Sequence, residues 1–281
     1  MKGTAMLEYK EGNIKLDDVR LHYYRTGGKK PPIILLHGAT DSGLCWGPVA
    51  ELLAEKYDVI MPDAQGHGLS DRLDAAFTFK SHMQQAAGLS LGLGLNKPII
   101  MGHSMGAGTA VNVAVEYPSL PKAIILEDPA WIPPAPPGQE NGEEEKKRRE
   151  DFHNYLTGLS NKTLEEIVAG GRAENPRWSE EEIIPWAQSK LQFDATLFSR
   201  EVINRTSYTE FVPQIKCPTL LIISEGGIVS KDVAENAARI WKSKNPFKWV
   251  YIEGAGHNIR REQFEEYKKA VFGFLDSLPA K

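Results

Sequence analysis

The chain has 281 residues, of which 41% are hydrophobic and 25% charged, and its formal net charge is −4. This is ordinary globular composition, and the slight acidic excess with no clustered Lys and Arg predicts no nucleic-acid partner. No apolar run approaches the ~20 residues that cross a bilayer, so we expect no membrane span.

The cysteine content and the N-terminal segment bear on the compartment. Cys45 and Cys217 lie far apart in the sequence, so we expect no disulfide scaffold. Free thiols fit a reducing compartment. The first residues contain no apolar core of signal-peptide length. Together these features predict a cytoplasmic protein.

Short apolar runs alternate with helical stretches along most of the chain. The first 27 residues are predicted to be extended, with a strand near Val19–Tyr24. The further predicted strands are Ile33–Leu36, Asp58–Met61, Pro98–Met101, Ala123–Leu126, Thr219–Ile223 and Trp249–Ile252. The predicted helices are Trp46–Lys56, Lys80–Leu93, Met105–Glu116, Asp232–Lys242 and Arg261–Leu278. Apolar runs without polar alternation fit strands that are covered on both faces, so we expect a mainly parallel, doubly wound α/β sheet.

One segment interrupts this alternation. About ninety residues between Leu126 and Thr219 contain no convincing strand. The segment opens with a Pro-rich linker, 133–138, and continues with the charged run Glu143–Asp151. That run mixes signs at i to i+4 spacing, which favours a solvated helix. We expect a helical insertion over one edge of the sheet.

A G-x-S-x-G sequence, GHSMG, follows the predicted strand Pro98–Met101 and precedes a helical pattern. This is the context that a nucleophilic serine on a strand-to-helix turn requires. Such a turn strains the serine backbone, and side chains at Gly102 or Gly106 would collide with neighbouring strands. Ser104 is therefore the predicted nucleophile.

An oxyanion hole is predicted where the strand Ile33–Leu36 runs into His37 and Gly38. Acyl transfer develops negative charge on the substrate carbonyl oxygen, and two preorganised backbone N–H groups can stabilise it. The expected donors are Met105, which follows the nucleophile, and Ala39. We expect His37 to brace the loop by hydrogen bonds.

These motifs resemble the α/β-hydrolase family, in the subgroup with a helical cap. The resemblance covers nearly the whole chain and rests on four motifs in family order: LLHG at Leu35–Gly38, MPDAQGHGLSD at Met61–Asp71, GHSMG at Gly102–Gly106 and GAGH at Gly254–His257. It implies a hydrolase core of residues 1–130 and 209–281 and a cap of residues 131–208, inserted after the sixth strand. It also implies a structural role for the GHGLSD segment.

The resemblance assigns the general base to His257, because this histidine follows the last predicted strand. An imidazole suits proton transfer, since its ordinary pKa lies near neutrality. It would take the Ser104 proton and return a proton to the leaving group.

The acid that should orient His257 departs from the family pattern. The family usually places an aspartate just past the strand that follows the cap, and Gly227 stands there. Asp128, at the carboxyl end of the preceding strand, is the favoured replacement, because some family members resemble this arrangement. Glu225 is the main alternative, and Glu127 stays open.

The predicted activity is hydrolysis of a carboxylic ester or lactone, a small molecule, through an acyl-enzyme and without metal or cofactor. A carbon–carbon bond hydrolase with the same triad and a ligand receptor of the same fold are the alternatives. Cys45 is expected to serve packing. Monomer and homodimer both stay open. The residues expected to line the substrate pocket are Trp46, Trp131, Trp178, Trp186 and Met105.

Overall fold

The computed structural model describes residues 8–131, 143–159, 161–199 and 207–279. The predicted Pro-rich linker, 133–138, lies outside the described residues. None of the described helices is long and apolar enough to cross a membrane. Cys45 and Cys217 are both free and buried.

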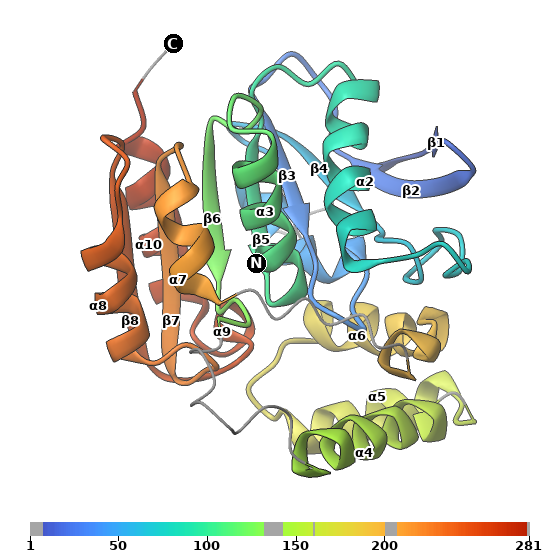
Figure 1. Ribbon diagram of the computed structural model, residues 1–281. Helices are drawn as coiled ribbons and strands as arrows, with labels where there is room; N and C mark the ends of the chain where they lie inside the picture. Colours follow the sequence, from blue (N-terminus) through green and yellow to red (C-terminus); the bar gives the residue numbers. More distant parts are fainter. Residues whose placement is uncertain (1–7, 132–142, 160, 200–206, 280–281) are drawn as a thin grey trace, which may run out of the picture.

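An eight-stranded sheet runs through the centre of the molecule (Figure 1). Its strand order is β1-β2-β4-β3-β5-β6-β7-β8, and β3 to β8 run parallel to one another. The strand predicted near Val19–Tyr24 is confirmed as β2. It pairs with β1, which the sequence predicted only as extended, in an antiparallel hairpin that joins the sheet through β4. The strands are β1 Lys10–Leu16, β2 Val19–Arg25, β3 Pro32–Leu36, β4 Asp58–Pro62, β5 Ile99–His103, β6 Ala123–Glu127, β7 Thr219–Gly226 and β8 Phe247–Gly256.

Helices cover both faces of the sheet, which confirms the predicted doubly wound α/β architecture. Alternate strand residues serve opposite cores, because successive side chains of a strand point to opposite faces. Ile34 and Leu36 pack in the core beneath α2, α3 and α8, whereas Ile33 and Leu35 pack in the core beneath α1 and α10. These helices are α1 Gly47–Leu53, α2 Phe79–Gly92, α3 Met105–Glu116, α8 Lys231–Ile240 and α10 Phe264–Asp276.

The predicted insertion lies between β6 and β7. Its helices, hereafter the insertion helices, are α4 Glu143–Leu159, α5 Leu164–Glu174, α6 Glu180–Gln192 and the short η2 Ala195–Ser199. They lie at the carboxyl end of the parallel strands, at the bottom of Figure 1. The predicted charged helix is confirmed as the start of α4. The chain returns to the sheet through α7 Tyr208–Phe211 and η3 Val212–Gln214.

The first and the last predicted helices differ most from the structure, while α2 and α8 are displaced at their ends by one or two residues. The first is shorter and starts as a 3-10 turn, η1 Gly43–Trp46, before α1. The last is broken at Gln263, whose φ of −136° is not helical, into α9 Ile259–Glu262 and α10. The separate short α9 lets Arg260 and Arg261 enter the interior, where they are 0% and 5% exposed.

Candidate active site

Ser104 lies on the turn between β5 and α3. Its φ of 50° and ψ of −113° are strained for a residue with a side chain, and its N–H donates to the Glu127 carbonyl at 3.0 Å. The glycines of the motif are required by space. A Cβ at Gly106 would lie 2.6 Å from the His37 carbonyl oxygen, and one at Gly102 would overlap the backbone of Gly106. The predicted collision with a neighbouring strand is confirmed for Gly106, whereas Gly102 is needed to make room for the start of α3.

His257 and Asp128 are brought together by two separate loops at the carboxyl end of the sheet. The imidazole Nδ1 donates to Asp128 Oδ2 at 2.6 Å, across 129 residues of sequence. The histidine side chain is 33% exposed, while Asp128 is fully buried. Because Nδ1 carries the hydrogen-bonded proton, Nε2 is left as the proton acceptor.

The loop after β7 holds the Asp128 carboxylate from the other side. The backbone N–H groups of Ile228 and Val229 donate to it at 2.8 Å and 3.0 Å. A Cβ at Gly227 would lie 2.7 Å from Asp128 Oδ1. The Asp128 carboxylate thus lies in the space beside position 227, where the family's usual acid would be attached.

The two alternative acids make contacts elsewhere. Glu225 is exposed, and its carboxylate accepts a hydrogen bond from the N–H of Gly254 at 3.1 Å. Glu127 is fully buried and accepts from the N–H of Arg260 at 2.9 Å and from its guanidinium at 3.1 Å. Burial raises the pKa of Glu127, although Arg260 lowers it. Among the three carboxylates weighed from the sequence, Asp128 is the one in contact with His257.

His103, which the sequence analysis did not single out, supports the base. Its Nε2 donates to the carbonyl oxygen of His257 at 3.0 Å, and the two rings are 4.6 Å apart. Burial holds the pKa of His103 well below its usual value, and nearby Arg260 lowers it further. A neutral His103 can therefore fix the backbone of the base. Its position next to Ser104 in GHSMG was the available signal.

The predicted oxyanion loop forms a tight turn. The N–H of Asp41 donates to the carbonyl of Gly38 at 3.2 Å, and Thr40 has φ of 70°. His37 Nδ1 donates to the same Gly38 carbonyl at 2.8 Å, and its Nε2 accepts from the N–H of Ala64 at 3.0 Å. The Gly38 carbonyl and the Ala39 N–H belong to one peptide unit. His37 therefore orients the unit that carries the expected donor.

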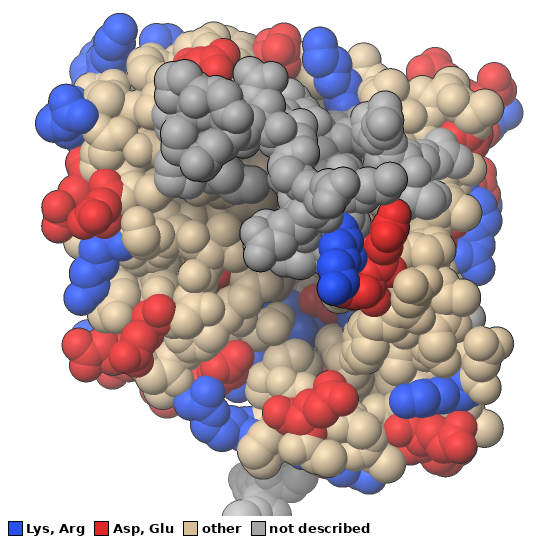
Figure 2. All heavy atoms as spheres, turned by 60° about the horizontal axis from the view of Figure 1, so that its bottom comes forward, with Lys and Arg blue, Asp and Glu red and all other residues tan. Residues whose placement is uncertain are grey.

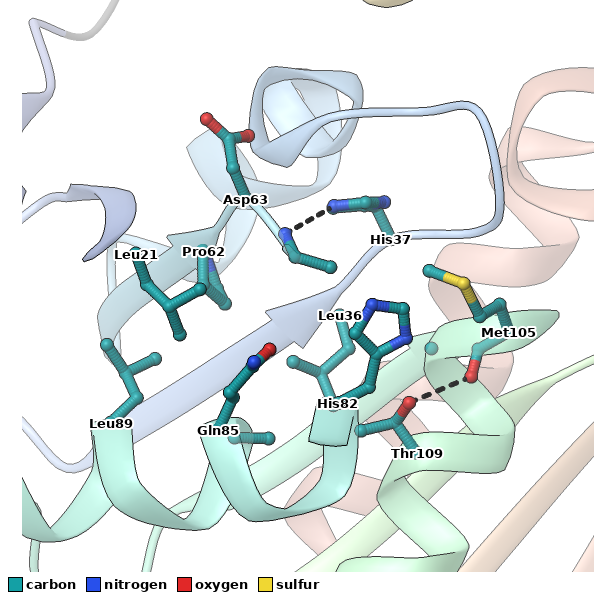
Figure 3. A pocket seen from close by; sticks show the side chains of 13 residues that line it. Leu21, Leu36, His37, Pro62, Asp63, His82, Gln85, Leu89, Met105 and Thr109 are labelled. Carbon is teal, nitrogen blue, oxygen red and sulfur yellow. Dashed lines mark hydrogen bonds between the residues drawn. The ribbon is translucent and has the colours of Figure 1, made fainter. Parts of the chain in front are cut away.

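A small cavity adjoins this loop on the side of α2 and α3 (Figure 3). Its volume is about 30 Å³, enough for about two water molecules. The close-up shows His82 and Gln85 from α2 and Met105 and Thr109 from α3 around it. Mostly apolar groups line this cavity, which is too small for a substrate of several heavy atoms.

The tryptophans expected in the substrate pocket lie in apolar cores. Trp46 is 0% exposed, with the Arg260 guanidinium 4.3 Å from its ring centre, and Trp131 is 3% exposed and stacked on Tyr208. Neither has free surface to offer a substrate in this structure. Trp178 and Trp186 contact each other within the apolar cluster of the insertion helices.

Met105 borders that same cluster, as a half-buried side chain directly after Ser104. The expected pocket role of Met105 stays a prediction, as do those of Trp178 and Trp186.

Acidic and basic side chains are interspersed on the face at the carboxyl end of the strands (Figure 2). Over the described ranges, no group of three or more His, Cys, Asp or Glu side chains is arranged to hold a metal ion.

A family model described as "Alpha/beta hydrolase family" matches residues 33–270, and the chain belongs to this family. The chain is 26% identical over 271 residues to N-formylmaleamate deformylase of Pseudomonas putida, covering 94% of this chain and 96% of the relative.

Solved structures share the fold. The crystal structure of E-2-(acetamidomethylene)succinate hydrolase superposes with a TM-score of 0.78 at 19% identity, covering 96% of this chain and all of the other. A thermophilic esterase from Thermogutta terrifontis gives a TM-score of 0.71 at 24% identity, with 96% and 100% covered. The relatives named here are all hydrolases.

Proposed function

We propose that this protein is a serine hydrolase that cleaves a carboxylic ester or lactone through an acyl-enzyme, with Ser104 as nucleophile, His257 as base and Asp128 as acid. The hydrogen bond of 2.6 Å between His257 Nδ1 and Asp128 Oδ2 carries the proposal. This bond fixes the tautomer of an imidazole that follows β8, and Ser104 lies on a strained turn after β5, at the same carboxyl edge of the sheet. This arrangement supports the proposal.

In the acylation step, His257 Nε2 takes the proton of the Ser104 hydroxyl as the serine oxygen bonds to the substrate carbonyl carbon. The negative charge that develops on the carbonyl oxygen is stabilised by the N–H groups of Met105 and Ala39. The carbon–oxygen bond to the alcohol then breaks. The imidazolium gives its proton to the departing alkoxide, while the Asp128 carboxylate stabilises the positive charge on the ring.

In the deacylation step, His257 takes a proton from water, and the hydroxide oxygen bonds to the acyl carbon. The bond to Ser104 breaks, and the imidazolium returns the proton to the serine oxygen. The carboxylic acid leaves and the enzyme is restored. For a lactone, the alcohol and the acid are parts of one product.

A second substrate class is favoured by the relative of similar length. Because the chain matches a protein named as a deformylase over 94% of its length, N-acyl compounds join esters and lactones as substrates to test.

We also propose that residues 131–208 act as a cap over the hydrolase core of residues 1–130 and 209–281. Substrate choice would then depend on this cap, since one fold hosts many chemistries.

The test is hydrolysis of p-nitrophenyl acetate by the wild type and by Ser104→Ala, with labelling of both proteins by a fluorophosphonate. We expect repeated turnover and labelling at residue 104 in the wild type and neither in the variant. Turnover that survives in Ser104→Ala would contradict the assignment of the nucleophile. Labelling without turnover would favour the carbon–carbon hydrolase or receptor alternative.

A further inference from the structure

Six charged side chains form a buried cluster between the insertion helices and the sheet. Glu182 and Lys190 come from α6, and the other members come from the loop after β3, the end of β6 and α9. We call this the Asp41 cluster, and its members are Asp41, Glu127, Glu182, Lys190, Arg260 and Arg261, each 6% exposed or less.

Asp41 joins the cluster together. Its carboxylate lies 3.2 Å from Lys190 Nζ, 2.8 Å from the Arg261 guanidinium and 3.4 Å from that of Arg260. Burial by itself would raise the pKa of Asp41, but these cations hold it far below its usual range. The carboxylate is thus ionised with three cations around it. Arg261 also pairs with Glu182 at 2.8 Å, which ties α9 to α6.

Lys190 makes contacts beyond this ion pair. Its Nζ donates to the carbonyl oxygen of Thr40 at 2.9 Å and to the Thr40 hydroxyl at 2.8 Å. The two residues are 150 positions apart in the sequence. Both contacts fall on Thr40, and the residue before it in the same turn, Ala39, carries the expected oxyanion donor.

Thr40 is an unfavourable residue for the conformation it adopts. A φ of 70° belongs to the left-handed region, and a β-branched residue there is a genuine outlier. Turns that need positive φ at the third position ordinarily use Gly or Asn. Thr40 is third in the turn closed by the hydrogen bond from Asp41 to Gly38. A contact from outside the turn must therefore hold Thr40 in this conformation. The Lys190 ammonium makes such a contact, because it binds both the hydroxyl oxygen and the carbonyl oxygen of Thr40.

Stability alone is a poor explanation for such a cluster. Buried ion pairs seldom stabilise more than apolar packing of the same volume, because desolvation offsets their attraction. The cluster instead draws on three segments of the proposed active site. Asp41 closes the oxyanion turn, Glu127 directly precedes Asp128, and Arg260 lies in α9, just after His257.

We propose that Lys190 of α6 is a positioning residue, which holds Thr40 in its strained conformation and so aims the Ala39 N–H at the substrate oxyanion. This inference rests on the proposed function. It assigns to the insertion helices a part in forming the oxyanion hole, in addition to covering it.

The test uses Lys190→Met, which removes the ammonium but keeps the stem. Asp41 stays paired with Arg260 and Arg261 in this variant, so we expect it to fold. Lys162→Met, at an exposed lysine next to α5, is the matched control. The double variant Lys190→Met/Thr40→Gly also replaces Thr40 by glycine, which adopts a positive φ without strain. We would measure kcat and KM for p-nitrophenyl acetate per fluorophosphonate-titrated site, the Tm, and the Ala39 amide resonance.

The expected result is a loss of kcat of about 10- to 100-fold in Lys190→Met with little change in KM, since an oxyanion donor acts in the transition state. The Ala39 resonance should shift, Lys162→Met should match the wild type, and the double variant should recover most of the lost kcat. Unchanged kcat per titrated site, even with a lower Tm, would overturn the proposal.

Failure of the proposed function gives a different result. In that case the wild type itself would show no turnover of the ester, with or without labelling. The Ala39 resonance still decides the positioning role there, because an unshifted resonance in Lys190→Met would overturn it without any activity.

Discussion

The carboxylate of Asp128 lies in the space that a side chain at position 227 would need. A Cβ on Gly227 would be 2.7 Å from Asp128 Oδ1, well inside ordinary contact distance. The N–H groups of Ile228 and Val229 bind the same carboxylate. Asp128 follows β6, yet its carboxylate occupies the position that an acid on the loop after β7 usually fills. Glycine at position 227 leaves the space for it.

Asp128→Asn should lower kcat by about ten-thousandfold while the protein stays folded, since an amide favours the wrong imidazole tautomer. Glu225→Gln is the matched control, because Glu225 is exposed and contacts the Gly254 N–H. It should retain most of the activity. Ester turnover and circular dichroism of the two variants check this. The reverse ranking of the two variants would transfer the acid role to Glu225.

Moving the acid back to the loop after β7 is a sharper test. Gly227→Asp alone should destabilise the protein, because the new side chain meets the Asp128 carboxylate at close range. Asp128→Gly/Gly227→Asp removes that clash, and glycine accepts the φ of 41° at position 128. The double variant should be more active than Asp128→Gly. Equal kcat values for these two proteins would count against a shared acid site.

Two glycines two positions apart, at the start of α3, should respond oppositely to alanine. A Cβ at Gly106 meets the backbone of Leu36 and His37, whereas one at Gly108 has no neighbour within 4 Å. Gly106→Ala should lower the free energy of unfolding by about 1–3 kcal/mol or more. Gly108→Ala should raise it by up to about 1 kcal/mol through helix propensity. Urea unfolding of both variants measures these changes. A Gly106→Ala variant as stable as the wild type would argue against a tight strand-to-helix turn at Ser104.

The buried histidines should make the protein sensitive to acid. Burial, the largest cause, lowers the pKa of His82 from 6.5 to about 4. Below pH 6.5 His82 binds a proton in the unfolded chain, whereas in the folded protein it stays neutral until about pH 4. The free energy of unfolding therefore falls across this pH window. His82 alone should remove about 2 kcal/mol by pH 5.

His82→Gln isolates this contribution, because glutamine does not titrate. Urea unfolding at pH 7.5 and pH 5.0 should show a smaller loss in the variant than in the wild type. His37, His67 and His103, which are also buried with lowered pKa values, remain in both proteins. Equal losses in the two proteins would show that His82 is not buried neutral.

Sequence patterns alone predict the α/β class, the helical insertion after the sixth strand and the strand-to-helix turn at Ser104. These features depend on local patterns: apolar runs fit buried strands, and G-x-S-x-G fits a strand-to-helix turn. The predicted helix Met105–Glu116 is confirmed at both ends. The broken helix at Gln263, the shorter α1 and the earlier end of α8 at Ile240 differ from the prediction, because tertiary packing overrides propensity at helix ends.

Long-range packing determines which carboxylate meets His257 and what supports the oxyanion turn. The sequence allowed three acids, Asp128, Glu127 and Glu225. The pairing of β6 with β7 brings Asp128 to the imidazole of His257. Lys190 and Thr40 meet across 150 residues. No local pattern encodes such contacts, because the first depends on how the strands pair and the second on how the insertion helices pack on the carboxyl end of the sheet.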